Sequence, residues 1–536
     1  MTLAGLMQQR ALMISDIIRF AATAHPSREI VSRNVEEPLW RYDYARCHRR
    51  VAQAARMLLR LGVKPGDRVT SLSWNTHRHF ELFFAVPGIA GVLHTANPRL
   101  PDEHLIYTIN HAGSTLLLID RNMAPIVERI RDRLPAIETV IVLSDAERAL
   151  PGLACYETLI EGEEPEFDWP RFDENAGAFL CYTSGTTGDP KGVLYSHRSV
   201  VLHGLAEGLS GSMDFSAFDV IMPCQSLYHA TAWGLPFAGA INGAKFVLPG
   251  DRMDAASLHE LISTEGVTFT GGVPTIWTMY LDHLVRIGAG TGTLRRVVIG
   301  GSAVPRDMAV AFHERGVAVH QLWGMTETSP VGVSSTSTPA LAGLGREEEQ
   351  EHLWTRQGRM VFGIEIEIVD EQGRPLPHDG ATSGALLVRG PWVVERYFRA
   401  EQSACGVDGW FDTGDIATID PQGFMRITDR RKDVIKSGGE WISSIDLENA
   451  AAGCPGVKIA AVAGVYHPKW EERPIMLIET HEGAQVREAD VAAWLSSRVA
   501  KWWMPDRIVF ARVPMTATGK IDKKVIRELY RDVLRD

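Results

Sequence analysis

The stretch that decides the fold is a short apolar run followed by a loop of hydroxyls, glycines and one lysine. The run is Ala178-Phe179-Leu180-Cys181, and it leads into Tyr182-Thr183-Ser184-Gly185-Thr186-Thr187-Gly188-Asp189-Pro190-Lys191-Gly192. Glycines let backbone N–H groups approach anionic oxygens, hydroxyls add donors, and lysine adds charge. The loop predicts a phosphate site, although a Ser/Gly-rich surface turn fits its composition equally well. It is not a Walker A loop, because Lys191 is followed by Gly192 and the GxxxxGK spacing fails.

On both sides of this loop the apolar residues alternate between helix spacing and strand spacing. Within residues 42–63 they recur at i, i+3, i+4, i+7 and i+8 from Val51 to Leu59, which predicts an amphipathic helix. Short β-branched or Leu-rich runs lie at 68–72, 115–119, 140–143, 220–222, 245–248, 267–270 and 297–299. Strands separated by helix-length stretches favour parallel sheets, so the sequence predicts two α/β units, one before and one after residue 175.

The pattern changes after residue 360. Ile364-Glu365-Ile366-Glu367-Ile368 alternates apolar and charged residues, and Gly/Pro turns divide residues 362–389, which predicts antiparallel β structure. Residues 429–439 are rich in charge and glycine, and the chain beyond them carries strands and helices of its own. This segment is the predicted boundary of a small C-terminal domain.

Composition and charge exclude several classes of protein. The 536 residues are 45% hydrophobic and 23% charged, as in ordinary globular proteins. Lys and Arg total 55 against 66 Asp and Glu, a net charge of −11, which disfavours nucleic acid and anionic lipid as partners. The most apolar stretch, 83–93, is shorter than a membrane span, and residues 1–19 lack a signal-peptide pattern. Six scattered cysteines form no CxxC pair, so we expect buried free thiols in a cytoplasmic enzyme.

The phosphate loop resembles the signature of the adenylate-forming superfamily, which includes acyl-CoA synthetases, luciferases and peptide-synthetase adenylation domains. Further motifs resemble this family in its order: Gly300-Gly301-Ser302-Ala303; Trp323-Gly324-Met325-Thr326-Glu327; Gly409-Trp410-Phe411-Asp412-Thr413-Gly414-Asp415; Asp429-Arg430-Arg431-Lys432-Asp433; Lys436-Ser437-Gly438-Gly439-Glu440-Trp441-Ile442; and Thr518-Gly519-Lys520. The match extends from about residue 40 to 525, which replaces the surface-turn interpretation of the loop. Trp233-Gly234 after His229, and Trp441, look most like medium- and long-chain fatty acyl-CoA synthetases and methylthiopropionate-CoA ligases.

The resemblance implies an α/β fold with two domains of unequal size. We expect a large N-terminal domain at 1–430 that binds ATP and the acyl group, built from two α/β subdomains plus a β-barrel region. A hinge at 431–433 would then connect it to a small mobile α+β C-terminal domain at 434–536.

The resemblance also implies a reaction in two halves, with ATP, Mg²⁺ and CoA as cofactors. A carboxylate attacks the α-phosphate of MgATP to give an acyl-adenylate and pyrophosphate, and the CoA thiol then displaces AMP. The implied partners are a small-molecule carboxylic acid, ATP and CoA, without nucleic acid and without a membrane span. A homodimer is left open.

The resemblance assigns nucleotide and metal contacts to particular residues. Thr183 and Glu327 resemble the family's magnesium contacts, and their hydroxyl and carboxylate suit a hard cation. Asp415 would accept hydrogen bonds from the ribose hydroxyls beside Arg430, although these two could instead form a structural ion pair. Trp323 keeps a flat face where the family more often has Tyr. The implied ATP- and AMP-binding residues are Thr183, Ser184, Gly185, Thr186, Thr187, Gly188, Lys191, Gly301, Ser302, Ala303, Gln321, Leu322, Trp323, Gly324, Asp415 and Arg430.

The resemblance also assigns residues to catalysis and to the change of domain position between the two half-reactions. Lys520 would stabilise negative charge between the carboxylate and the α-phosphate during adenylation. Lys432 occupies the family's hinge position, and Gly438 and Gly439 would line the thiol's approach after rotation, although the glycine pair also fits an ordinary turn. The residues assigned to catalysis are Lys520, Glu327, Thr326 and Lys436, and those assigned to the hinge and CoA access are Lys432, Gly438, Gly439 and Trp441.

The acyl pocket is assigned to His229, Ala230 and Trp233, a stretch that borders it in relatives. Trp233 resembles the aromatic residue that gates a fatty-acyl tunnel in some of them, and a core tryptophan is the alternative. We expect a short- to medium-chain fatty or related acid as substrate. Two other functions stay open, an acyl-AMP ligase that loads a carrier protein and a nucleotide-binding module without turnover. The presence of Lys520, Glu327 and Asp415 argues against the module.

Overall fold

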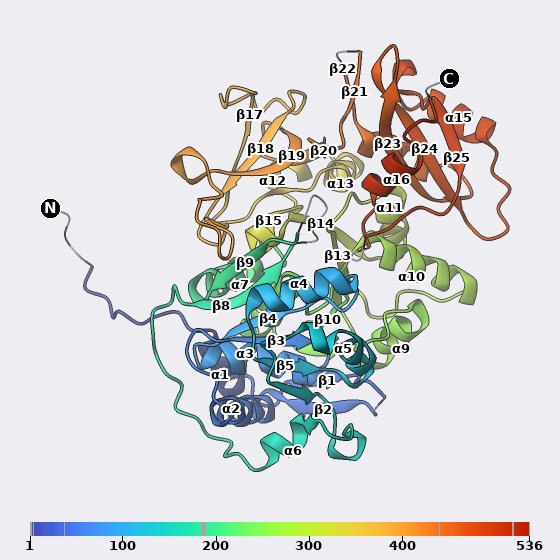
Figure 1. Ribbon diagram of the computed structural model, residues 1–536. Helices are drawn as coiled ribbons and strands as arrows, with labels where there is room; N and C mark the ends of the chain where they lie inside the picture. The colour runs from blue at the N-terminus through green and yellow to red at the C-terminus, as the bar shows by residue number, and fades with distance from the viewer. Residues whose placement is uncertain are drawn as a thin grey trace.

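The computed structural model describes residues 3, 5–36, 38–183, 189–438, 440–516 and 519–534. Figure 1 shows a broad α/β part from which the N-terminal segment projects, an antiparallel sheet above it, and a C-terminal part beside that sheet. The α-helices are α1 (Ile14–Ala24), α2 (Tyr44–Arg60), α3 (His77–Gly88), α4 (Asp102–Ala112), α5 (Ala124–Ile130), α6 (Tyr156–Glu161), α7 (His197–Gly208), α8 (Leu235–Ile241), α9 (Ala255–Glu265), α10 (Pro274–Ile287), α11 (Arg306–Glu314), α12 (Pro339–Ala342), α13 (Arg346–Thr355), α14 (Ser444–Ala452), α15 (Glu488–Ser496) and α16 (Lys523–Leu529).

The first mixed sheet has seven strands in the order β7-β6-β5-β3-β4-β8-β9. Its strands are β3 (Arg68–Leu72), β4 (Val92–Thr95), β5 (Leu116–Ile119), β6 (Thr139–Val142), β7 (Ala154–Cys155), β8 (Gly177–Tyr182) and β9 (Gly192–Ser196). Neighbours from β7 to β8 run parallel, whereas β9 pairs antiparallel with β8. The phosphate loop therefore connects two adjacent strands at one end of this sheet.

The second mixed sheet has nine strands in the order β16-β15-β14-β13-β12-β10-β11-β1-β2. Its strands are β1 (Glu29–Ser32), β2 (Trp40–Asp43), β10 (Val220–Pro223), β11 (Lys245–Leu248), β12 (Phe269–Gly272), β13 (Arg296–Gly300), β14 (Ala318–Gly324), β15 (Val331–Ser334) and β16 (Arg359–Met360). The predicted strands are confirmed, with bounds shifted by at most two residues. The predicted two α/β units are thus two mixed sheets, but residue 175 does not separate them, because β1 and β2 belong to the second sheet and β8 and β9 to the first.

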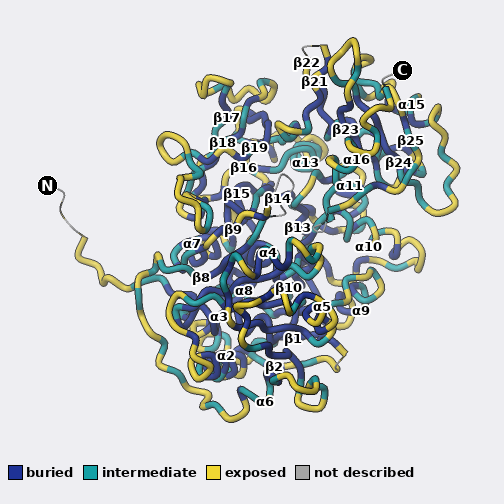
Figure 2. Tube along the Cα trace, viewed as in Figure 1, coloured by how far each residue is buried: buried dark blue, intermediate teal, exposed yellow. Residues whose placement is uncertain are grey.

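Helices α2 and α3 form as the residue pattern dictates. The carboxylate of Asp43 accepts a hydrogen bond from the Arg46 N–H and caps α2, whose apolar stripe is buried. Helix α3 is buried on every side, because it lies between the two sheets (Figure 2). The Phe83 ring lies 5.0 Å from that of Phe179 on β8 and 5.9 Å from that of Phe237 on α8. This packing joins both sheets in one core.

The region expected to be a β-barrel is instead an open antiparallel sheet. Its strands are β17 (Glu365–Val369), β18 (Gly384–Arg389), β19 (Phe411–Ile419) and β20 (Met425–Arg430), and each pairs with the next in chain order. The alternating pattern fixed antiparallel pairing but carried no signal for closure, which depends on contacts between the first and last strands.

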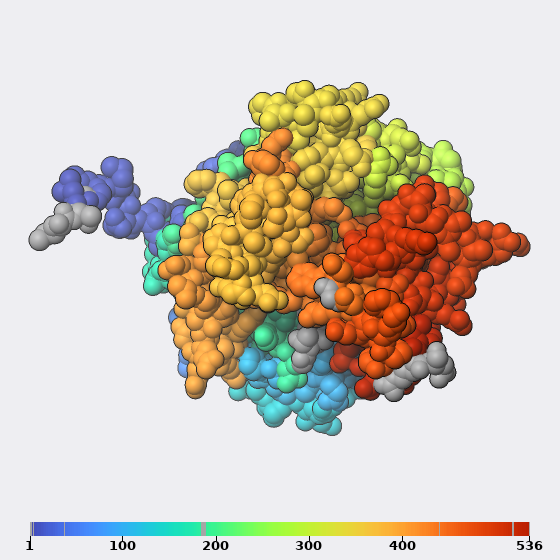
Figure 3. Space-filling model, turned by 90° about the horizontal axis from the view of Figure 1, so that it is seen from above, coloured from blue at the N-terminus to red at the C-terminus, as the bar shows by residue number. Residues whose placement is uncertain are grey.

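The C-terminal part has a sheet of its own. Its strands are β21 (Ile435–Ser437), β22 (Glu440–Ile442), β23 (Val457–His467), β24 (Glu471–Thr480) and β25 (Arg507–Phe510), and α14, α15 and α16 accompany it. Seen from above, this part lies beside the antiparallel sheet over the α/β part (Figure 3). A short turn of residues 431–434 connects β20 to β21.

Two expectations about composition can also be compared with the structure. The six cysteines are free; five are buried, and Cys405 is partly exposed. Within the ranges that the structure describes, no helix combines the length and the apolar character needed to cross a bilayer.

Candidate active site

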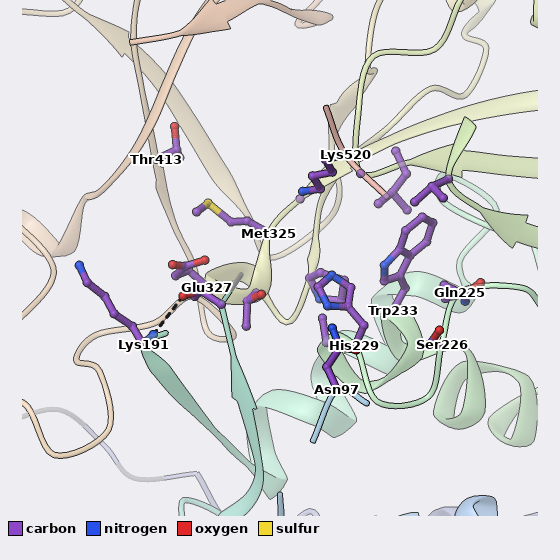
Figure 4. Close-up of a pocket in the computed structure, with 18 of the residues that line it drawn as sticks. Asn97, Lys191, Gln225, Ser226, His229, Trp233, Met325, Glu327, Thr413 and Lys520 are labelled. Atoms are coloured by element: carbon purple, nitrogen blue, oxygen red, sulfur yellow. Dashed lines mark hydrogen bonds between the residues drawn. The ribbon is translucent and has the colours of Figure 1, made fainter. Parts of the chain in front are cut away.

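A cavity of about 530 Å³ lies where both mixed sheets meet β19, β20 and the turn before α16. Figure 4 shows two sides of it, with Lys520 entering between Met325 and Trp233. We name the sides the phosphate-loop wall (Thr183, Lys191, Met325, Glu327 and Thr413) and the Trp233 wall (Gln225, Ser226, His229, Ala230 and Trp233). The predicted site residues that line the cavity are Thr183, Lys191, His229, Ala230, Trp233, Gly301, Leu322, Gly324, Thr326, Glu327, Arg430 and Lys520.

The phosphate loop closes through its two ends. The Thr183 N–H donates to the Lys191 carbonyl at 2.9 Å, and the Lys191 N–H donates to Thr183 Oγ1 at 3.1 Å. These two hydrogen bonds hold Thr183 and Lys191 side by side, and both residues line the cavity. The predicted phosphate contacts between them, Ser184, Gly185, Thr186, Thr187 and Gly188, lie outside the described residues.

Glu327 lies on a one-turn 3₁₀ helix, η5 (Thr326–Thr328), and is only 7% exposed. The Tyr397 hydroxyl donates to Glu327 Oε1 at 2.7 Å, and the Tyr195 hydroxyl donates to the Thr326 carbonyl at 2.6 Å. In the ranges described, no three His, Cys, Asp or Glu side chains converge as a metal cluster. Glu327 and Thr183 nevertheless offer a carboxylate and a hydroxyl to the same cavity, and these are ligands that Mg²⁺ accepts.

Asp415 is 1% exposed, and protein donors already bind both of its oxygens. Trp323 Nε1–H donates to Oδ2 at 2.9 Å, and Arg430 Nε lies 2.6 Å from Oδ1. The ion pair considered from the sequence is therefore present. Burial raises the pKa of the Asp415 carboxyl, while Arg430 and the Trp323 N–H act in the opposite direction. A carboxylate has about four lone-pair positions, so these bonds leave acceptor capacity for a ligand.

Lys520 belongs to a turn that packs against the cavity rather than to an exposed chain end. Its backbone N–H donates to Thr516 Oγ1 at 3.2 Å. Burial of the ammonium, together with the nearby Arg430 guanidinium, lowers the pKa of Lys520 to about 8. The ammonium is therefore still mostly charged at pH 7. It acts in a poorly hydrated site, where a positive charge exerts a stronger field than in water.

The Trp233 wall is built on strained backbone. In the 3₁₀ turn η4 (Ala230–Gly234), the residues Ala230, Thr231, Ala232 and Trp233 all have positive φ angles, from 44° to 57°. Left-handed conformation costs about 1–2 kcal/mol for each non-glycine residue, so other contacts must hold this turn. One of them is the Gln225 amide, which donates from Nε2 to the Ala232 carbonyl at 2.9 Å.

Gly301 lies close to both the Trp233 indole and the Lys520 side chain. A Cβ atom on Gly301 would lie 3.8 Å from Trp233 Cζ2 and 4.0 Å from Lys520 Cε. Gly301 thus keeps a narrow space open between the two side chains. Burial and the neighbouring Lys520 lower the pKa of His229 to about 4, so its imidazole is neutral at pH 7. Trp233 is 6% exposed, packs within the core cluster and also lines the cavity.

Several predicted site residues do not line this cavity. The Gln321 amide donates to the Leu353 carbonyl on α13 at 3.3 Å, so its side chain is directed away. Lys436 and Trp441 face each other across the β21–β22 hairpin, which lies at the top of Figure 1. Ser302, Ala303, Trp323, Asp415, Lys432, Lys436, Gly438 and Trp441 are not in contact with the cavity. Gly439 lies outside the described residues. Their assigned roles stay predictions.

Sequence reasoning missed several side chains of this site, among them Tyr397, Gln225 and Ser226. Tyr397 contacts Glu327, while Gln225 and Ser226 line the Trp233 wall. None of them lies in a motif with a recognisable spacing. Gln225 and Ser226 follow β10, and the carboxyl end of a parallel strand is where ligand-binding residues gather, so that position was the available signal.

The two principal parts of the chain match two family descriptions. Residues 18–398 match the AMP-binding enzyme family, and residues 446–520 match the AMP-binding enzyme C-terminal domain. A solved anthranilate CoA ligase in complex with anthranoyl-AMP has the same fold, with a TM-score of 0.87 and 23% identity over 99% of both chains.

Curated relatives align over nearly the whole chain. The 3-methylmercaptopropionyl-CoA ligase of Ruegeria lacuscaerulensis is 44% identical over 99% of both chains. The medium-chain-fatty-acid–CoA ligase of Ectopseudomonas oleovorans is 41% identical over 99% of this chain and 98% of its own. The long-chain-fatty-acid–CoA ligase of Thermus thermophilus is 44% identical over 98% and 97%. The resemblance drawn from the motifs is thus confirmed, and the chain belongs to the AMP-binding enzyme family.

Proposed function

We propose that this protein is an AMP-forming acyl-CoA ligase for a short- to medium-chain fatty acid or a related carboxylic acid. A carboxylate oxygen bonds to the α-phosphorus of ATP as pyrophosphate leaves, and the CoA sulfur then bonds to the acyl carbon as AMP leaves. The observation that carries the proposal is the position of Lys520 between the phosphate-loop wall and the Trp233 wall (Figure 4). An acid and a nucleotide held by these walls would meet beside its ammonium.

Lys520 would act in the first half of the reaction. Negative charge is shared there between the attacking carboxylate and the α-phosphate, and a fixed cation stabilises that charge in a poorly hydrated site. The neutral His229 on the Trp233 wall adds no competing charge. It can offer the carboxylate one hydrogen bond from a ring N–H.

The phosphate-loop wall would hold the nucleotide. Lys191 and the Thr183 hydroxyl would bind phosphate oxygens, and Asp415 would accept the ribose hydroxyls while Trp323 and Arg430 fix its orientation. Gly301, Leu322 and Gly324 would allow close approach of the adenine and the acyl-phosphate. Glu327 and Thr183 would hold Mg²⁺, which neutralises phosphate charge when bound.

The Trp233 wall would hold the acid. Trp233 limits the space beyond Gly301, which supports a substrate of short to medium length. Relatives whose names specify 3-methylmercaptopropionyl and medium-chain fatty acyl groups support the same range. The name of the Thermus relative specifies long-chain acids, so chain length is the property to measure.

For the second half of the reaction we propose rotation of the C-terminal part (434–536) about a hinge at 431–433. Lys432 lies in the turn between β20 and β21, and Gly438, Gly439 and Trp441 would reach the thiol's path only after rotation. Proline fixes φ near −65°, so Lys432→Pro should leave adenylation intact and slow thioester formation by orders of magnitude. Thioester formation that kept pace with adenylation in this variant would show that Lys432 is not the pivot.

The function is tested by one assay with two readouts. Straight-chain acids from C4 to C14, 3-methylmercaptopropionate and benzoate are each incubated with ATP and Mg²⁺, with and without CoA. Pyrophosphate release and thioester formation are measured separately. The proposal expects acid-dependent pyrophosphate release, and CoA-dependent thioester for the same acids. Pyrophosphate without thioester would favour a ligase that loads a carrier protein, and neither product would favour a binding module.

A further inference from the structure

The segment 392–398, which follows β18, crosses both parts of the phosphate-loop wall. On one side the Val394 N–H donates to the Glu327 carbonyl at 2.7 Å. The Ser329 hydroxyl donates to the Trp392 carbonyl at 2.8 Å, so the residue that follows the η5 turn is bound to this segment as well. On the other side the Phe398 N–H donates to the Gly192 carbonyl at 2.8 Å. The segment therefore connects the turn of Glu327 to the end of the phosphate loop.

Within this segment one side chain touches functional groups on both sides. The Tyr397 hydroxyl donates to Glu327 Oε1 at 2.7 Å, and the Lys191 ammonium lies 4.8 Å from the centre of the Tyr397 ring. The first contact is a charge-assisted hydrogen bond, and the second is a cation–π contact. The Tyr397 hydroxyl thereby holds the Glu327 carboxylate, and the face of its ring holds the Lys191 ammonium.

The hydroxyl contact also sets how Glu327 can meet a cation. A phenol keeps its proton at neutral pH, so the Tyr397 hydroxyl donates to the Glu327 carboxylate. Across the described part of the chain, Tyr397 is the donor recorded to the Glu327 carboxylate, and it occupies Oε1. Among the described residues no hydrogen bond to Oε2 is present, so Oε2 would be the oxygen available to a metal ion.

We propose that Tyr397 is a positioning residue, which orients Glu327 toward Mg²⁺ through its hydroxyl and Lys191 toward the phosphates through its ring. This inference rests on the proposed ATP-dependent function. The two contacts can be separated, because phenylalanine keeps the ring and loses only the hydroxyl, whereas leucine loses both. Tyr397→Phe should therefore affect metal dependence alone, and Tyr397→Leu should also weaken the nucleotide itself.

The test is calorimetric binding of α,β-methylene-ATP to the intact protein, with either Mg²⁺ or EDTA present. The readout is the ratio of the dissociation constant in EDTA to that in Mg²⁺. We expect Tyr397→Phe to reduce this ratio about tenfold, the effect of one hydrogen bond to a charged group, and to change binding in EDTA less than about twofold. Tyr397→Leu should weaken binding in EDTA as well, by about three- to tenfold.

Tyr156→Phe is the matched control. The Tyr156 hydroxyl donates to Glu81 Oε2 at 2.8 Å in the core beside α2 and α3, remote from the cavity. The Tyr156→Phe variant loses the same kind of hydrogen bond, so its stability should fall comparably. Its ratio of dissociation constants in EDTA and in Mg²⁺ should stay at the wild-type value. An unchanged ratio in Tyr397→Phe, or an equal drop in Tyr156→Phe, would overturn the positioning role. Failure of the wild-type protein to bind the nucleotide would instead overturn the proposed function and this inference with it.

Discussion

The two walls of the cavity are held by different kinds of force. On the phosphate-loop wall, directional bonds fix the polar groups: Tyr397 to Glu327, and behind it Trp323 and Arg430 to Asp415. The Trp233 wall is a left-handed turn held by the hydrogen bond from the Gln225 amide, by local hydrogen bonds within residues 229–232, and by packing. Directional bonds define one geometry, whereas a packed apolar wall accepts exchanges among hydrophobic groups of similar volume. We therefore expect substitutions on the first wall to change rates, and those on the second to change which acid is used.

Each wall has a buried carboxyl group behind it, and the two carboxyls differ in their hydrogen bonds. Glu207 on α7 is 1% exposed, and neither of its carboxyl oxygens has a hydrogen-bond partner. His203 Nδ1 lies 3.9 Å from Oε2, beyond hydrogen-bond distance. A Cβ atom on Gly234 would lie only 2.4 Å from the same oxygen, so the strained turn packs directly on this carboxyl. Asp415, which is equally buried, has two donors.

The largest effect should come from Lys520, which lies between the walls. Lys520→Ala removes the cation that we propose stabilises charge only in the first half of the reaction, so pyrophosphate release should fall about a thousandfold. Conversion of supplied acyl-adenylate and CoA to thioester should fall less than about tenfold. Stopped assays of each half-reaction measure the two losses. Equal losses in both halves would contradict this assignment and with it the proposed meeting point of the walls.

A smaller effect should follow from substitution of Trp323, which lies behind the phosphate-loop wall. Trp323→Phe removes the N–H that orients Asp415, and the Michaelis constant for ATP should rise about tenfold with an unchanged preference among acids. Trp277→Phe is the matched control, because Trp277 is also buried but its Nε1 has no partner to lose. A change in acid preference in Trp323→Phe would break the proposed division of roles between the walls.

On the packed wall, Trp233→Ala should alter selectivity rather than rate. If the indole caps a fixed pocket, the vacated volume admits longer acids, each methylene worth about 0.8 kcal/mol or roughly fourfold in kcat/KM. If it swings aside when ATP binds, long acids are already accepted and acid binding becomes less dependent on nucleotide. The profile of kcat/KM from C4 to C14, with acid binding measured with and without nucleotide, separates these outcomes. An unchanged profile and an unchanged nucleotide dependence would make Trp233 a core residue only.

The same two walls show what the sequence could predict. Helix α2 and the parallel strands follow from local periodicity, and Lys191, Glu327 and Lys520 were found because their motifs are contiguous. The contact of Trp323 with Asp415 spans 92 residues, and that of Tyr397 with Glu327 spans 70, so no local pattern encodes them. The left-handed turn at Ala230–Trp233 was missed for a different reason. It contains no glycine before Gly234, and its positive φ angles are imposed by the surrounding core.

The smallest effect on turnover, but the sharpest test of the packed wall, should come from Glu207→Gln. Burial raises the pKa of the Glu207 carboxyl well above its ordinary value, so it stays neutral in the folded protein. In the unfolded chain it ionises near pH 4.5, so wild-type stability is lost as the pH rises from that value toward the folded-state pKa. Glutamine does not ionise. The stability advantage of the variant should therefore grow above pH 4.5, by up to about 1.4 kcal/mol per pH unit.

Glu157→Gln should behave in the opposite way. Burial opposes ionisation of Glu157 too, but its contacts with His77 and Arg50 outweigh that effect and lower its pKa. A lowered pKa contributes stability above the unfolded-state value and loses it as the pH falls, so this variant should be less stable than wild type at pH 7. Urea unfolding of both variants and the wild type between pH 5 and 8 should show an advantage of Glu207→Gln that grows with pH and a nearly constant deficit of Glu157→Gln. The Glu157 carboxyl is ionised in both the folded and the unfolded state over that range, so its deficit should shrink only below pH 4.5. If Glu207→Gln followed the wild-type slope, Glu207 would be ionised in the fold. The Trp233 wall would then rest on a charge that must be paired, and the contrast between the walls would fail.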